Sequence, residues 1–89
     1  MTNQELNDLI ILETKKILAD SGHANVEVTA NANFSDLQLD SLQFIELLAR
    51  LEEEARVELL DSEFYGIKTI SDASELINQK LRKSRSSQD

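Results

Sequence analysis

Apolar residues recur at helical spacing near the start of the chain. Thr2 and Glu5 have the spacing of a capping box, and Ser21 and Gly22 can end a helix. Between them, apolar side chains repeat every three to four positions, as on one face of a helix. These are Leu6, Leu9, Ile10 and Ile17, widened by Leu12 and Leu18. The pattern predicts a helix over residues 3–20.

A second helix is predicted from Ser41 to about Arg56. Asp40 is a candidate N-cap with Gln43 at the N3 position, a variant of the capping box. At 100° per residue, one broad face is apolar and the opposite one is polar. The apolar face contains Phe44, Ile45, Leu47, Leu48, Leu51 and Ala55; the polar face contains Gln43, Glu46, Arg50, Glu53 and Glu54.

The remaining segments complete an all-α pattern. Residues 21–39 show no sustained period and predict a long loop, which Phe34, Leu37 and Leu39 could pin to the core. Residues 62–66 predict at most one helical turn. A third capping box at residues 69–72 precedes a last apolar stripe: Ile70, Ala73, Leu76, Ile77 and Leu81. We expect a small four-helix bundle, with three main helices and one short helix, over residues 1–82, and a disordered polar tail over 83–89.

Composition and charge exclude several classes of function. The 89 residues lack cysteine and have one histidine, His23, so disulfides, thiolate metal sites and a histidine relay are excluded. The net charge is −8, and residues 1–79 hold sixteen acids against five bases. Such a surface repels nucleic acid and suits partners with basic patches. No membrane-spanning run or signal segment is apparent, so we expect a cytoplasmic location. We also expect a monomer.

The candidate chemistry reduces to a single serine. No catalytic pair, phosphate-binding glycine loop or calcium loop is present, and the consecutive carboxylates of residues 52–54 point in different directions on a helix. The sequence therefore does not predict an enzyme. Ser41 falls in the first turn of the second helix, where unpaired N–H groups and the helix dipole favour a phosphate.

The residues around Ser41 resemble the acyl carrier protein family. Residues 34–42, Phe-Ser-Asp-Leu-Gln-Leu-Asp-Ser-Leu, are similar to the signature Phe-x-Asp-Leu-Gly-x-Asp-Ser-Leu of that family. The likeness continues through Ile-Glu-Leu at 45–47, Leu-Glu-Glu-Glu at 51–54 and residues 58–61 to residues 67–70, which precede the last helix. It covers about half of the chain closely.

The resemblance implies a function for this serine. Ser41 would receive 4′-phosphopantetheine from coenzyme A through a phosphopantetheinyl transferase, and the terminal thiol of the arm would carry acyl groups as thioesters. Asp40, Leu42, Glu46 and Glu53 would contact the basic surfaces of that transferase and of acyl-loading, elongating and acyl-transfer enzymes. The resemblance implies no catalytic residue and no metal.

Three positions depart from the family pattern. Gln38 replaces a glycine, Leu60 replaces a proline, and Ala55 replaces a bulky core residue whose volume Phe44 could partly fill. If residue 38 needs a positive φ, glutamine costs on the order of 1 kcal/mol there. Together these departures favour a specialised carrier, of polyketide or other secondary metabolism, over a housekeeping fatty-acid carrier.

Two alternatives remain open at this stage. A free-standing peptidyl or aminoacyl carrier would commonly show Gly-Gly before its serine and a less acidic second helix, unlike Leu39-Asp40 and the glutamates here. An acidic helical adaptor without a prosthetic arm would use Ser41 as capping chemistry alone.

Overall fold

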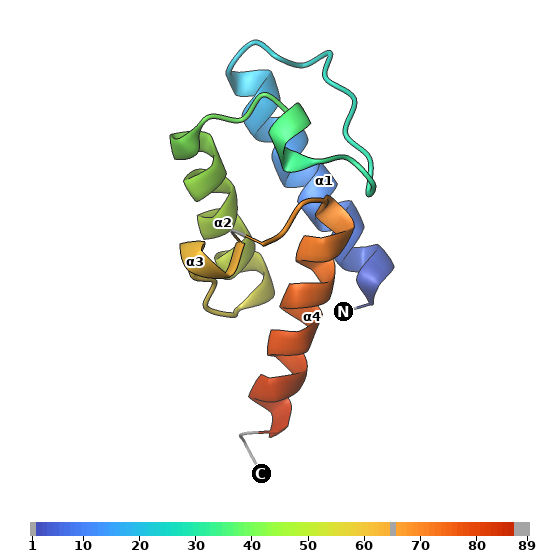
Figure 1. Cartoon of the computed structure of the whole chain (residues 1–89), viewed down its shortest axis with the longest axis vertical. Helices are drawn as coiled ribbons and strands as arrows, with labels where there is room; N and C mark the ends of the chain where they lie inside the picture. The colour runs from blue at the N-terminus through green and yellow to red at the C-terminus, as the bar shows by residue number, and fades with distance from the viewer. Residues whose placement is uncertain (1, 65, 87–89) are drawn as a thin grey trace.

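The computed structural model describes residues 2–64 and 66–86 and contains four α-helices and one short 3-10 helix (Figure 1). The α-helices are α1 (Asn3–Asp20), α2 (Ser41–Ala55), α3 (Asp61–Phe64) and α4 (Ile70–Ser86), and the 3-10 helix is η1 (Phe34–Asp36). No strand occurs within the described ranges, where Asn33 and Thr69 form an isolated bridge. The predicted all-α class, with three main helices and one short one, is confirmed.

The three long helices begin where their capping boxes predict. The Thr2 hydroxyl accepts from the Glu5 N–H, and the Glu5 carboxylate accepts from the Thr2 N–H. Asp72 and Thr69 make the same reciprocal pair at the start of α4. Backbone N–H groups of Thr69 and Lys68 lower the pKa of the Asp72 carboxyl, because they stabilise its charged form. Each box satisfies donors that lack an intrahelical acceptor.

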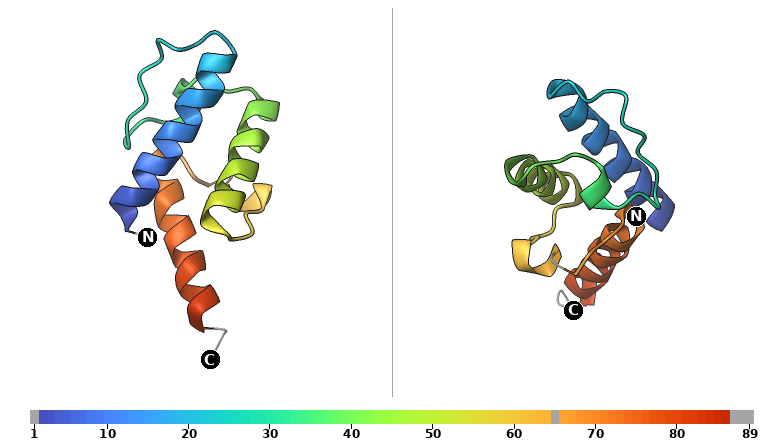
Figure 2. Two further views of the ribbon diagram at one scale, coloured as in Figure 1. Left: turned by 180° about the vertical axis from the view of Figure 1, so that it is seen from behind. Right: turned by 45° about the horizontal axis from the view of Figure 1, so that its top comes forward.

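The core lies where α1 packs against both α2 and α4 (Figure 2). Its buried side chains are aliphatic, apart from one phenylalanine on α3. They are Leu6, Ile10, Ile17, Leu18, Val28, Leu37, Leu47, Leu48, Leu51, Ala55, Leu59, Phe64, Ile70, Ala73 and Ile77. Burial of these side chains provides the main stabilising contribution to the fold.

Two residues assigned to the apolar faces lie outside the core. Leu12 is 51% exposed and Ile45 is 49% exposed. Leu12 follows the buried Ile10 by two positions, and Ile45 precedes the buried Leu47 by two. Two helical positions correspond to about 200°, so neither pair can share one face. The predicted apolar faces were therefore too wide.

Backbone hydrogen bonds tie the long first loop to the start of α4. The Phe34 N–H donates to the Lys68 carbonyl at 2.9 Å, and the Ser71 N–H donates to the Ala30 carbonyl at 2.9 Å. The loop thus accepts from an N–H of the first turn of α4, and Leu37 anchors it at 1% exposure. The predicted pinning is confirmed: Leu37 is buried in the core, and the half-buried Phe34 and Leu39 pack against it.

The last helix is longer than predicted. We expected the helix to end before Lys83, whereas α4 continues through Ser86 and extends past the other helices (Figure 1). No apolar residue follows Leu81, yet the helix continues, because Lys, Arg and Ser can propagate a helix. Residues 83–86 of the expected tail are therefore helical, and its residues 87–89 lie outside the described residues.

The side chain of Glu63 ties the short helix α3 to the residue before it and to α4. The Leu60 N–H donates to Glu63 Oε1 at 3.0 Å, and Lys80 on α4 makes an ion pair with the same oxygen at 2.6 Å. Both bonds lower the pKa of the Glu63 carboxyl, and the bond from Lys80 has the larger effect. A proline at position 60 would lack this N–H. Leucine therefore replaces the fixed turn of a proline with a capping bond.

Gln38 occupies the left-handed region, with φ of 60°. A glycine there carries no Cβ penalty, so Gln38→Gly should raise the free energy of unfolding by about 0.5–1 kcal/mol after the larger chain entropy of glycine is counted. Gln38→Ala is the matched control: it removes the same exposed side chain but keeps Cβ, so it should not stabilise. Urea unfolding compares the three proteins. If both variants raised the free energy of unfolding equally, the destabilisation would come from the glutamine side chain and not from the positive φ of the backbone.

Candidate functional site

Ser41 is exposed and is the first residue of α2. Asp40 precedes it as the N-cap: its carboxylate accepts from the Gln43 N–H at 2.8 Å, and its own N–H donates to Gln43 Oε1 at 2.9 Å. The predicted capping box is confirmed. The box leaves the Ser41 hydroxyl outside the helix hydrogen bonds, at the positive end of the helix dipole.

A shallow depression lies beside this serine. Its volume is about 270 Å³, and it is lined by Phe34, Ser35, Leu39, Asp40, Ser41 and Phe44. The Phe44 ring meets Phe34 edge to face at 5.5 Å between centroids, and meets Phe64 on α3 at 6.0 Å. The three rings connect η1, α2 and α3, and those of Phe34 and Phe44 give the depression a partly apolar wall.

The expected contact residues follow the outer side of α2. Leu42 is 78% exposed, Glu53 is exposed, and the Glu46 side chain is 52% exposed. Ile45 lies beside them as an exposed apolar residue, although the sequence pattern had assigned it to the apolar face of this helix. Its distance of two positions from Leu47 was the signal that could have placed it on this surface.

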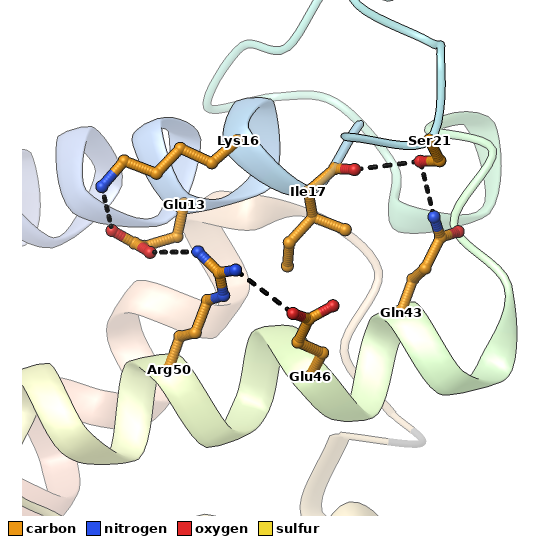
Figure 3. A network of polar contacts seen from close by, with 7 residues as sticks. All are labelled: Glu13, Lys16, Ile17, Ser21, Gln43, Glu46 and Arg50. Atoms are coloured by element: carbon orange, nitrogen blue, oxygen red, sulfur yellow. Dashed lines mark hydrogen bonds and ion pairs between the residues drawn. The ribbon is translucent and has the colours of Figure 1, made fainter. Parts of the chain in front are cut away.

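The polar side of α2 reaches α1 (Figure 3). Arg50 Nη1 lies 3.3 Å from Glu13 Oε1 of α1, and Arg50 Nη2 lies 3.2 Å from Glu46 Oε1, one turn away on α2. Lys16 pairs with the other oxygen of Glu13 at 3.2 Å. Both bonds of Arg50 raise the pKa of its guanidinium, and the bond to Glu46 has the larger effect. Sequence reasoning placed Arg50 on the polar face but could not find its partner thirty-seven positions away.

A second link between α1 and α2 fixes the end of α2 that bears the serine. The Gln43 amide donates to the Ser21 hydroxyl at 2.6 Å, and that hydroxyl donates to the Ile17 carbonyl at 2.9 Å (Figure 3). Ser21 is the C-cap of α1. The N-terminus of α2, and with it Ser41, is therefore attached to the C-terminus of α1.

The local geometry fits a covalently attached phosphate ester. In the first turn, the Gln43 N–H donates to the Asp40 side chain and the Phe44 N–H to the Asp40 carbonyl. The N–H groups of Ser41 and Leu42 lie in the first turn and have no carbonyl acceptor within the helix. They are therefore available to a phosphate attached to the serine oxygen.

Within residues 2–64 and 66–86, no helix is long and apolar enough to cross a membrane.

Comparison with known proteins identifies the family. The profile of the phosphopantetheine attachment site family matches residues 15–77. An acyl carrier protein of Clostridium perfringens is 39% identical over 71 residues, covering 78% of this chain and 93% of the relative. One from Thermosynechococcus vestitus is 42% identical over 79 residues, covering 85% and 98%. Acyl carrier protein 4, chloroplastic, of Arabidopsis thaliana is 34% identical over 82 residues, covering 92% and 56%.

The chain belongs to the acyl carrier protein family. It is therefore a carrier and not a catalyst, and its prosthetic group is phosphopantetheine. The resemblance inferred from residues 34–70 is confirmed by these matches.

Proposed function

We propose that Ser41 carries the phosphopantetheine arm and that the chain delivers acyl thioesters between biosynthetic enzymes. The observation that carries this proposal is the position of Ser41: an exposed hydroxyl at the first residue of α2, behind the Asp40–Gln43 capping box. When bound, the arm supplies a thiol for acyl groups. Asp40 holds the helix end in shape, and the first-turn amides stabilise the phosphate charge.

The proposed cargo is an acyl chain of polyketide or other secondary metabolism, with fatty-acid synthesis as the alternative. The departures at positions 38, 55 and 60 support the specialised role: Gln38 has a positive φ, Ala55 is buried, and the Leu60 N–H is used in capping. The partners we propose are a phosphopantetheinyl transferase and acyl-loading, elongating and acyl-transfer enzymes with basic patches. The expected cytoplasmic location and monomeric state remain predictions.

A loading panel tests the proposed class of cargo. The protein bearing the arm is incubated separately with malonyl and acyl transferases and with amino-acid-activating adenylation enzymes, and intact mass reports which group is transferred. We expect acyl but no aminoacyl loading. Aminoacyl loading alone would contradict an acyl cargo and favour a peptidyl carrier.

The outer face of α2 predicts a charge effect on modification. Glu46 and Glu53 lie two turns apart, so one basic partner surface can meet both. Glu46→Lys with Glu53→Lys should lower kcat/KM for the transferase about tenfold at low salt, mainly through KM, and added salt should narrow the difference.

A matched control separates this face from total charge. Glu27→Lys with Glu75→Lys makes the same change in net charge at exposed positions of the loop and α4. This control should lower kcat/KM much less. Equal losses in the two double variants would show that the face of α2 has no special role.

A further inference from the structure

Glu46 shares its charge with a cation of the same chain. Arg50 Nη2 lies 3.2 Å from Glu46 Oε1, and Arg50 is the only basic residue of α2. Figure 3 shows the guanidinium between Glu46 and Glu13. A partner cation that approaches Glu46 therefore meets a carboxylate that already has a counter-ion.

The position of Arg50 is fixed from the α1 side. The Glu13 side chain is 7% exposed, and a buried carboxylate requires nearby cations. Lys16 supplies one, but its side chain is 52% exposed, while that of Arg50 is 33% exposed. Because the planar guanidinium can donate to two carboxylates at once, Arg50 holds Glu13 and Glu46 together.

We propose that Arg50 is a specificity-determining residue that competes, within the chain, with the basic groups of partners for Glu46. This inference rests on the proposed function, because it concerns the same partner-contact face. Arg50 disfavours partners that rely on a lysine or arginine opposite Glu46. Arg50 weakens binding less for partners that contact mainly the exposed Leu42 and Ile45, since those contacts are apolar.

The test is a mutant cycle on modification by a broad-specificity phosphopantetheinyl transferase with coenzyme A. Arg50→Gln should raise kcat/KM about two- to fivefold at low salt, through KM, the size expected for releasing one exposed ion pair. In the Glu46→Gln background the same substitution should give no gain. High salt should remove most of the gain in the wild-type background.

Arg56→Gln is the matched control. It removes one positive charge at the exposed C-cap of α2, a full helical turn and more beyond Arg50. Its effect should be smaller and the same with or without Glu46. A gain from Arg50→Gln that persists in the Glu46→Gln background, or that Arg56→Gln equals, overturns the proposal. No gain overturns it as well.

A second variant guards against a change in helix packing. Arg50→Gln leaves Glu13 with Lys16 alone, so Glu13→Gln with Arg50→Gln removes the buried charge together with its partner. This double variant should show the same gain in kcat/KM. If the double variant shows no gain in kcat/KM, the gain of Arg50→Gln comes from altered helix packing, and the proposed competition for Glu46 is wrong. If the Arg50 variants are modified at Ser41 at the wild-type rate, this inference fails and attachment at Ser41 stands; if the wild type is not modified at Ser41, the proposed function itself fails.

Discussion

Ser41→Ala should abolish modification while leaving the protein folded. The substitution removes the oxygen that would form the phosphodiester, so incorporation of a fluorescent coenzyme A analogue by the transferase should fall to background. The fold should be retained because Ser41 is exposed and alanine propagates a helix well. The melting temperature by circular dichroism should stay within a few degrees of the wild-type value.

Ser35→Ala is the matched control for that loss. Ser35 lines the same depression as Ser41 and is also exposed, but it lies on η1 and not at the start of α2. This variant should be labelled at nearly the wild-type rate. Labelling of Ser41→Ala, or loss of labelling in Ser35→Ala alone, would move the attachment site away from Ser41.

Leu37→Ala should destabilise the fold strongly. The Leu37 side chain is 1% exposed and joins the long loop to the core, so its truncation should cost about 2–5 kcal/mol. In a domain of this size that loss lowers the melting temperature by about 10 °C or more. Thermal unfolding followed at 222 nm in circular dichroism measures it.

Leu42→Ala makes the same substitution five positions away with the opposite consequences. Leu42 is 78% exposed, so stability should change by no more than about 0.5 kcal/mol. Modification by the transferase should slow on the order of tenfold, if this leucine becomes buried against the enzyme. A Leu42→Ala protein that melts as low as Leu37→Ala would contradict the burial of these two side chains.

The helices could be predicted from sequence because their signals are local. Asp40 and Gln43 lie three positions apart, as do Thr69 and Asp72, and each pair forms the reciprocal bonds expected of it. Ile45 could not be placed by counting apolar residues alone, because the width of the buried face depends on which neighbours cover it. The predicted length of α4 was too short because its end was placed where the apolar residues stop, and residues of adequate helix propensity continue beyond that point.

The site was predictable in its position but less so in its surroundings. The motif of residues 34–42 and the helix start at Ser41 indicated the candidate serine. The link of Gln43 to Ser21 and that of Arg50 to Glu13 depend on how α1 crosses α2, and no local pattern encodes those distances. Because the family has glycine at position 38, the sequence raised the question of a positive φ there, and the structure shows one for Gln38.

The most direct measurement is peptide mapping of the wild-type protein after incubation with coenzyme A and a broad-specificity phosphopantetheinyl transferase. Intact mass should increase by one phosphopantetheinyl group, and fragmentation should locate that group on Ser41. A protein whose mass does not change, or one that carries the group on a different serine, would contradict the central claim.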